Sequence, residues 1–152
     1  MQLSGEIEIV APRQRVWEVL TDPHQVAGCV PGDPKIEVID DRNLRVTAQI
    51  GNAFFQTSVT VEIELMDLEA PERATANATG AVMASPVTAT GSLVLEELGP
   101  NLTRAAWSAD VTLGGMLVGF AGMVQGPVQG GVDRTLACLK AKIETEAASS
   151  RE

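Results

Sequence analysis

The stretch that decides the fold is ATANATGAVMASPVTATGSL, residues 74–93. Its side chains alternate with a period of two, which predicts two β-strands separated by a turn at Ser85-Pro86. The positions that should face a core carry almost only alanine and glycine. Such a face either lets another element approach closely or leaves space, and the choice between these two interpretations depends on the rest of the chain.

The same period extends over residues 35–113 and predicts six antiparallel strands. The turns between them are expected at Asp40-Asp41, Gly51-Asn52, Ala70-Pro71, Ser85-Pro86 and Gly99-Pro100-Asn101. Within 55–65, the residues that face one way are Phe55, Thr57, Val59, Val61, Ile63 and Leu65. One further half-buried strand is predicted over Gln2–Val10, where Leu3, Gly5, Ile7 and Ile9 alternate with polar residues.

Helical patterns precede and follow these six strands. A short helix is predicted after Pro12, with an apolar stripe of Val16, Trp17, Val19 and Leu20, and Asp22-Pro23 ends it. Residues 24–34 are rich in Gly and Pro and predict a loop with at most one more helical turn. A long C-terminal helix follows from the spacing of Val124, Val128, Val132, Leu136, Leu139 and Ile143.

The predicted fold class is α+β, with a seven-stranded antiparallel sheet wrapped around the long C-terminal helix and one or two short helices after the first strand. This is a helix-grip arrangement. A single domain is expected over residues 1–148, because 152 residues suffice for one continuous core, and residues 149–152 are expected to fray.

Composition excludes several functions. A net charge of −9 and the lack of any Lys/Arg run make nucleic acid an unfavourable partner. The opening MQLSGEIEIV lacks the features of a signal peptide, which predicts a cytoplasmic protein. Cys29 and Cys138 form no CxxC pair and cannot complete a metal site with the single His24, so both are expected to be free, reduced thiols.

Two interpretations of the small side chains compete. In the first, the glycines of residues 114–131 allow the long helix to pack closely on an alanine-lined sheet. In the second, larger side chains on the far half of the sheet hold the helix away like a wedge, and a cavity remains over the small residues. These larger side chains are Phe55, Val59, Val61, Ile63 and Leu65. The second is favoured, because a wholly apolar void is costly unless an apolar ligand fills it.

Candidate ligand-binding residues follow from the cavity interpretation. On the strands they are Ala76, Ala78, Gly80, Ala89, Gly91 and Trp107, whose ring could stack on a planar ligand. Met116, Phe120 and Met123 belong to an apolar, glycine-rich segment, residues 114–126, that is predicted to act as a lid and to touch a partner or a membrane surface. Cys29, Pro31 and Gly32 of the CVPG turn are expected at the mouth.

No catalytic residue is predicted. The chain has no tyrosine, and its one histidine, His24, follows Asp22-Pro23 in a loop where a solvated or capping role is expected. Cys29 has no histidine near it in sequence, so a nucleophilic role is not expected.

Residues 5–32, GEIEIVAPRQRVWEVLTDPHQVAGCVPG, resemble the start of the CoxG family, a family of carbon monoxide dehydrogenase subunits within the START-like (SRPBCC) superfamily. The matching features are AP-x4-VW at Ala11–Trp17, DP at Asp22-Pro23 and C-x-PG at Cys29–Gly32, and the strand order extends the resemblance over the whole chain.

This resemblance implies a non-enzymatic, helix-grip binder of a hydrophobic, quinone-like or lipid-like molecule, without a covalent cofactor, that serves a molybdenum hydroxylase. It also implies a location at the inner face of the membrane. Some members carry a C-terminal extension that ends in a membrane anchor, whereas this sequence ends at Glu152, so at most weak peripheral membrane contact is expected. Two alternatives stay open: a small enzyme of the polyketide-cyclase or hydrolase type, and an assembly factor that recognises only a protein.

Overall fold

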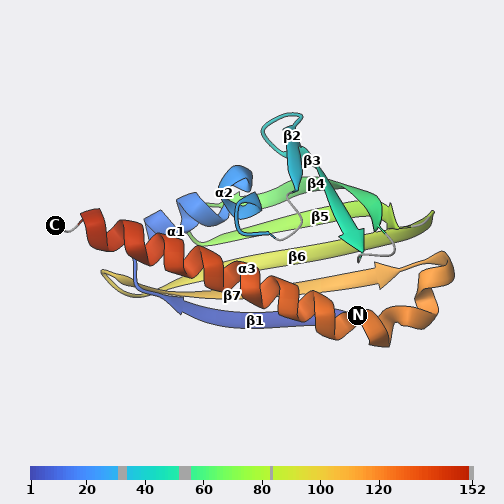
Figure 1. Cartoon of the computed structure of the whole chain (residues 1–152). Coiled ribbons are helices and arrows are strands. Elements are labelled where there is room, and N and C mark those ends of the chain that lie inside the picture. The colour runs from blue at the N-terminus through green and yellow to red at the C-terminus, as the bar shows by residue number, and fades with distance from the viewer. Residues whose placement is uncertain (31–33, 52–55, 83, 151–152) are drawn as a thin grey trace.

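The structure, a computed structural model, describes residues 1–30, 34–51, 56–82 and 84–150, with the side chains at 50, 51, 56, 57, 116, 117, 120, 121, 124, 127, 149 and 150 left out. The chain order is β1 (Gln2–Ile9), α1 (Arg13–Leu20), α2 (Pro23–Ala27), β2 (Lys35–Val38), β3 (Asn43–Gly51), β4 (Gln56–Glu69), β5 (Arg73–Val82), β6 (Ser85–Gly99), β7 (Leu102–Leu113), a 3-10 helix η1 (Gly115–Phe120) and α3 (Ala121–Ser150) (Figure 1).

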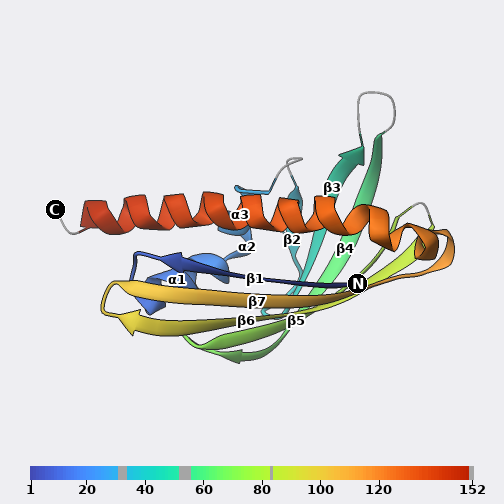
Figure 2. The same ribbon diagram turned by 90° about the horizontal axis from the view of Figure 1, so that it is seen from below.

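The strands form one seven-stranded sheet in the order β1-β7-β6-β5-β4-β3-β2, and every neighbouring pair is antiparallel. The helix α3 lies along one face of this sheet (Figure 2). The α+β helix-grip fold predicted from the alternation of side chains is confirmed. The register pairs Ala76 with Gly91 and Ala78 with Ala89, so the small residues of β5 and β6 meet across the strands as expected.

Two boundaries differ from the prediction. The turn between β5 and β6 lies between Val82 and Ser85, before the predicted Ser85-Pro86: Ser85 and Pro86 already pair with Val82 and Ala81 in the sheet, and Ala84 occupies the turn with φ of 66°. Ala84, which precedes the predicted turn in the stretch 74–93, therefore belongs to the turn and not to a strand. At the other end of the chain, α3 continues to Ser150, two residues into the tail that was expected to fray.

The fully buried core lies at one end of the sheet. Its members come from β1, α1, β6, β7 and α3: Ile9, Ala11, Val16, Trp17, Val19, Leu95, Ala105, Leu139 and Ile143. The Thr103 hydroxyl donates a hydrogen bond to the Ala11 carbonyl oxygen at 2.9 Å, which satisfies that buried polar group where the chain turns from β1 into α1. With 8% of its surface exposed, Trp17 packs in this core as predicted.

The C-terminal part of α3, residues 132–148, is anchored on this core and is called here the packed segment. Leu139 and Ile143 are buried, Arg15 forms an ion pair with Glu146, and the Val10 N–H donates to the Glu144 carboxylate at 2.8 Å. The Lys140 ammonium donates to the same carboxylate at 2.6 Å. These contacts hold the packed segment against both β1 and α1.

The preceding residues, 115–131, are called the open segment. Val118, Met123 and Val128 expose 62%, 72% and 39% of their surface. The Gln125 and Gln129 side-chain amides donate to the carbonyl oxygens of Gln2 and Ser4, each at 3.1 Å. Because β1 is an edge strand, these bonds cap its outer carbonyl groups and hold the helix along the edge of the sheet. Among the described parts of the chain, no helix is both long and apolar enough to cross a membrane.

Candidate functional site

A cavity of about 540 Å³ lies between the two short helices and the part of the sheet farthest from β1. The α1–α2 region and the chain leading to β2 form one wall, with Trp17, Leu20, Thr21, Pro23, Val26, Ala27, Val30 and Pro34. The strands and their turns form the other, with Ile36, Asp41, Leu44, Val46, Ile63, Leu65, Leu68, Ala74, Thr75, Ala76 and Leu93.

The lining is almost wholly apolar. Its polar side chains are those of Thr21, Thr75 and Asp41. The Thr21 hydroxyl already donates to the Trp17 carbonyl oxygen at 2.6 Å, and Asp41 is exposed. An apolar ligand would be stabilised in such a cavity because binding removes apolar surface from water. A polar ligand would find few hydrogen-bond partners there.

The two walls differ in how they are held. The strand wall belongs to the hydrogen-bonded sheet, whereas α2 has only five residues. Its N-terminus is capped by the Asp22 carboxylate, which accepts from the His24 N–H at 3.0 Å and from the Gln25 side-chain amide at 3.2 Å. The hydrogen bond from Gln25, and after it the one from His24, lowers the pKa of Asp22 despite some desolvation.

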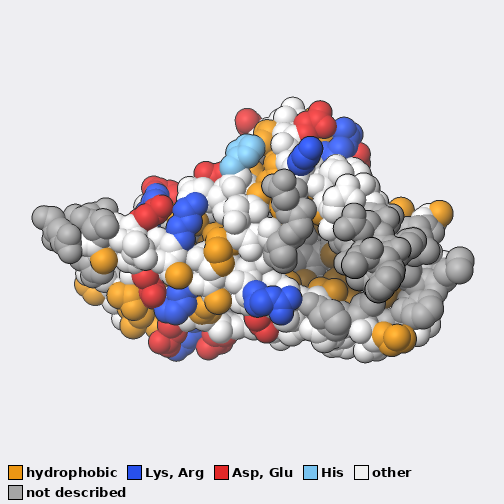
Figure 3. Space-filling view, viewed as in Figure 1, with side chains coloured by type: hydrophobic (Ala, Val, Ile, Leu, Met, Phe, Trp, Pro, Cys, Tyr) orange, Lys and Arg blue, Asp and Glu red, His pale blue; other side chains and the backbone are white. Residues whose placement is uncertain are grey.

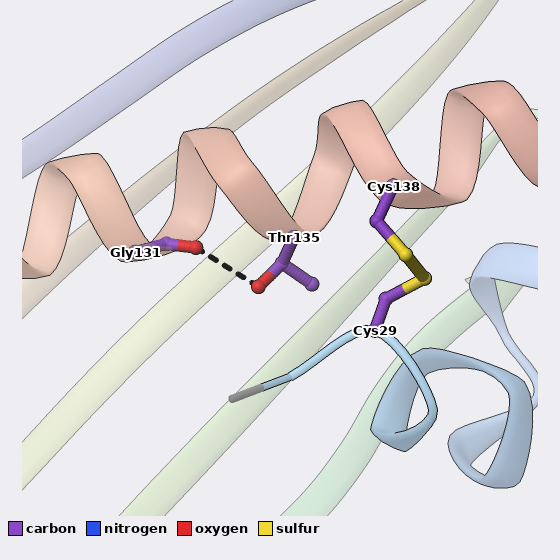
Figure 4. Close-up of a disulfide and its surroundings, with 4 residues drawn as sticks. All are labelled: Cys29, Gly131, Thr135 and Cys138. Carbon is purple, nitrogen blue, oxygen red and sulfur yellow. Dashed lines mark hydrogen bonds between the residues drawn. A yellow bond between two sulfur atoms is a disulfide. The ribbon is translucent and has the colours of Figure 1, made fainter. Parts of the chain in front are cut away.

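A disulfide between Cys29 and Cys138 joins the chain after α2 to the packed segment of α3 (Figure 4). The expectation that both cysteines are free thiols was wrong. They are 109 positions apart in sequence, but the fold brings their Cα atoms to 5.7 Å, within the range that a disulfide requires. Sequence spacing carries no information about this proximity, because α3 returns across the sheet to the α1–α2 end only in the folded chain.

One predicted ligand-binding residue, Ala76, lines the cavity. Ala78, Gly80, Ala89 and Gly91 follow on the same face of β5 and β6, are half-buried, and lie outside the cavity lining. Gly80 has a packing role, since a Cβ there would stand 2.7 Å from the Thr60 carbonyl oxygen. A direct role for these residues in ligand binding stays a prediction.

Trp107 also lies beyond the lining, although it pairs across β6 and β7 with Leu93, which does line the cavity. Its indole covers Gly5, where a Cβ would come within 2.6 Å of the ring nitrogen. That nitrogen is buried, and it has no hydrogen-bond partner among the residues that the structure describes. Ring stacking on a ligand stays a prediction for Trp107.

The other candidates belong to the lid and the mouth. Met123 is exposed on the open segment, whereas the side chains of Met116 and Phe120 lie outside the described part of the structure. In the mouth loop, Cys29 adjoins Val30 of the cavity wall, and Pro31 and Gly32 fall outside the described residues.

The glycines of the open segment test the interpretation that the helix packs closely on the sheet. A Cβ placed at Gly119, Gly122, Gly126 or Gly131 would meet no atom within 4 Å. These glycines therefore do not provide close contact. Of the side chains expected to hold the helix away, Ile63 and Leu65 line the cavity, and Phe55 lies outside the described residues. The wedge interpretation stays a prediction. The open segment is attached along β1 by the hydrogen bonds of Gln125 and Gln129.

Several lining residues were missed from the sequence, chiefly Val26, Ala27 and Val30 near α2 and Leu44 and Leu68 on β3 and β4. The only available signal was the apolar character of the segment around Cys29, in a region otherwise typical of a loop. Hydrophobic side chains are visible beside the single histidine, between α2 and β2, in the surface view (Figure 3).

The site offers little for catalysis. Asp41 is the one titratable side chain among the described residues that line the cavity. Within the described ranges, no group of three or more His, Cys, Asp or Glu residues is arranged to hold a metal ion.

Fold and cavity together define a helix-grip protein, with a sheet that curves around a long helix and an apolar cavity under the short helices. The family model of CoxG, a carbon monoxide dehydrogenase subunit, matches residues 5–144. The chain belongs to the CoxG family, which confirms the resemblance seen in residues 5–32.

Solved structures agree on the fold. A conserved protein from Geobacillus kaustophilus has a TM-score of 0.85 at 22% identity, with 95% of this chain and 96% of that chain covered. A protein from Thermus thermophilus has a TM-score of 0.72 at 19% identity, with 97% and 99% covered. The Zhui aromatase/cyclase from a Streptomyces species has a TM-score of 0.64 at 17% identity, with 100% and 96% covered. A comparison with curated protein sequences finds no match.

Proposed function

We propose that this protein is a non-enzymatic binder and carrier of a neutral, hydrophobic small molecule of the quinone type. The observation that carries the proposal is the apolar cavity of about 540 Å³ between the short helices and the sheet. A volume of this size lies within the range of small-molecule sites, and its apolar lining suits a ring system with a hydrocarbon chain.

The description of the family supports a partner for this carrier. A dehydrogenase requires an electron acceptor, and a quinone can act as one. A carrier that passes its quinone to a molybdenum-containing hydroxylase would supply that acceptor. The aromatase/cyclase among the similar folds raises the alternative of an enzyme. The cavity favours the carrier, because Asp41 at its exposed edge is a poor candidate for a positioned acid or base.

Native mass spectrometry of freshly purified protein tests the proposal directly. A retained mass of a quinone or an isoprenoid lipid supports the carrier. A protein that retains nothing, and that fails to bind an added naphthoquinone with a short isoprenoid chain, contradicts it and favours an assembly factor that recognises only protein.

Replacing either of two alanines of β5 by leucine tests where the ligand binds. Ala76 lines the cavity, whereas Ala81 is exposed on the same strand. We expect Ala76→Leu to weaken binding of the naphthoquinone by about tenfold or more, because the added atoms occupy ligand space. Ala81→Leu is the matched control and should bind normally. Quenching of Trp17 fluorescence reports the binding, since Trp17 lines the cavity.

If Ala76→Leu instead lowered the free energy of unfolding by about 1–3 kcal/mol and left binding unchanged, the space would be part of an ordinary core. The same comparison can be made for Ala78→Leu and Ala89→Leu, which test whether the ligand extends along β5 and β6 beyond the cavity.

Delivery requires contact with a membrane or an enzyme, and the open segment is the candidate surface. Residues 111–132 contain no charged side chain in a protein of net charge −9, and Val118 and Met123 are exposed there. We expect weak association with uncharged phosphatidylcholine liposomes, because apolar side chains on a neutral surface can enter the lipid interface. Met123→Asp should reduce this association, and Glu64→Asp, on an exposed strand position, should not.

The lid role of residues 114–126 is tested by hydrogen exchange. A lid predicts fast amide exchange that slows when the naphthoquinone binds. Slow exchange in both states would exclude a lid, and a Met123→Asp protein that delivers its ligand to liposomes at the wild-type rate would exclude the segment from membrane transfer.

A further inference from the structure

The disulfide joins a wall of the cavity to the long helix. Cys29 lies directly between cavity residues: Val26 and Ala27 precede it, and Val30 follows it. Cys138 lies on the packed segment of α3, whose own residues do not contribute to the cavity lining described above. The bond therefore ties the wall of the cavity near α2 to the packed segment.

Little else makes this connection. The backbone and side-chain hydrogen bonds of residues 23–30 are local: Val26 N–H to Asp22, Gly28 N–H to His24, Cys29 N–H to Val26, Val30 N–H to Ala27, and the two bonds of the Asp22 cap. The hydrogen bonds named above all stay within residues 22–30. Val26 and Cys29 also pack on the buried core, and α2 lies beside α1 and β2.

A helix of five residues is marginal by itself, because few of its backbone hydrogen bonds offset the cost of nucleation. The position of α2 must therefore come from its tertiary contacts. When one of these is a covalent bond, breaking it raises the population of conformations in which the stretch moves away from the strands.

We propose that the Cys29–Cys138 disulfide is a thiol-exchange site that controls opening of the cavity, an inference that rests on the proposed ligand-binding function. In the oxidised protein, residues 23–30 stay closed over the ligand. In the reduced protein, they open more often and ligand enters and leaves faster. If the protein is cytoplasmic, as its sequence predicts, a disulfide there is typically transient or regulatory and not a permanent structural bond.

The exchange is chemically complete with a dithiol reductant. Cys138 is exposed and Cys29 is half-buried, so the first thiolate of the reductant attacks Sγ of Cys138 and forms a mixed disulfide while Cys29 leaves as a thiolate. The second thiolate of the reductant then attacks its own sulfur in the mixed disulfide and releases Cys138. The reductant becomes a cyclic disulfide, and two electrons and two protons have moved to Cys29 and Cys138.

The experiment compares the dissociation rate of Nile red, a neutral apolar fluorophore, from oxidised protein and from protein reduced with dithiothreitol. We expect dissociation to be about tenfold faster, or more, after reduction. The Cys29→Ser/Cys138→Ser protein should release the dye at the fast rate whether or not dithiothreitol is present. Equal rates from oxidised and reduced wild-type protein would overturn the proposal.

Hydrogen exchange measured on the same samples does not depend on any ligand. Faster amide hydrogen exchange that is confined to residues 22–30 after reduction supports the proposal that the disulfide controls opening of the cavity. A uniform increase that includes β6 and β7 would show that the bond stabilises the whole fold, and it would overturn the proposal. If neither Nile red nor the naphthoquinone binds to the oxidised or the reduced protein, the proposed carrier function is wrong. The pattern of amide hydrogen exchange then decides by itself whether reduction frees residues 23–30.

Discussion

The open segment and the packed segment follow one another along the chain and meet very different surroundings. In the packed segment, Ile143 and Leu139 expose 0% and 1% of their surface, and the helix is tied to α1, β1 and the chain after α2. In the open segment, Met123 exposes 72%, and a Cβ at Gly126 would touch nothing. The comparison teaches that the apolar helical pattern buries only the part of α3 that meets large side chains on the sheet.

The same contrast runs through the sheet. Near the packed segment, β6 and β7 supply Leu95 and Ala105, which are buried in the core. Toward the open segment, the inward residues of β5 and β6 are small and only half-buried. Close packing of side chains stabilises one end of the molecule, and the other end retains accessible apolar surface.

The largest expected effect is at the packed segment. Ile143→Ala should lower the free energy of unfolding by about 2–5 kcal/mol, because it removes buried methyl groups and leaves a void. Met123→Ala is the matched control on the open segment and should change it by less than about 0.5 kcal/mol. Urea denaturation monitored by circular dichroism measures both. Equal losses would mean that the two segments are packed alike and would remove the distinction.

The next largest effect is the change in stability when a glycine is replaced by alanine. Its sign should differ between Gly126 in the open segment and Gly80 in β5. Gly126→Ala should stabilise the protein by about 0.5–1 kcal/mol, since alanine favours the helix and its methyl group meets nothing. Gly80→Ala should destabilise it by about 1–3 kcal/mol, because its Cβ would stand 2.7 Å from the Thr60 carbonyl oxygen. Thermal denaturation compares them. A destabilising Gly126→Ala would restore the interpretation in which the helix packs closely on the sheet.

The smallest effect concerns the acid sensitivity of the packed segment. The hydrogen bond from Lys140, and after it the one from the Val10 N–H, lowers the pKa of Glu144. A carboxylate with a lowered pKa stabilises the fold above its ordinary titration range, and this contribution is lost as the pH falls through the lowered value. We expect wild-type protein to be more stable than Glu144→Gln by about 0.5–1 kcal/mol at pH 7 and by less at pH 3.

The carboxylate at Asp22 is a useful comparison for that measurement, because its pKa is also lowered but it caps α2 at the cavity wall. At acid pH, protonation of Asp22 should speed amide hydrogen exchange in residues 22–30. An effect of acid on the packed segment should come from protonation of Glu144. A pH dependence in Glu144→Gln equal to that of the wild type would assign the acid sensitivity to other groups.

The sequence predicted the elements with a strong period. Alternation over residues 55–65 and 74–93 predicted β4, β5 and β6, and the recurrence of Leu136, Leu139 and Ile143 predicted the packed segment. The turn between β5 and β6 was predicted too late in the chain because Ser-Pro is a strong local turn signal, whereas the pairing of Ser85 with Val82 depends on the neighbouring strand.

The candidate site was predicted less well. The small residues of β5 and β6 correctly indicated a face that is not densely filled, and Ala76 lines the cavity. The cavity itself lies toward α1 and α2, and Val26, Ala27 and Val30 come from a stretch without regular periodicity. A wall built from a short helix and its flanking loop leaves no repeating pattern, so its apolar residues could not be assigned to a site from sequence alone.

By itself, the sequence determined the helix-grip fold, the family and the small, apolar side chains on one face of β5 and β6, because side-chain periodicity and composition act locally along the chain. Only the tertiary structure decided where the cavity lies, which part of α3 packs, and that Cys29 and Cys138 are bonded. Each of these depends on distances between residues far apart in sequence. Those distances are set by how α3 crosses the sheet: it is anchored on the core at one end and held along the edge strand β1 at the other.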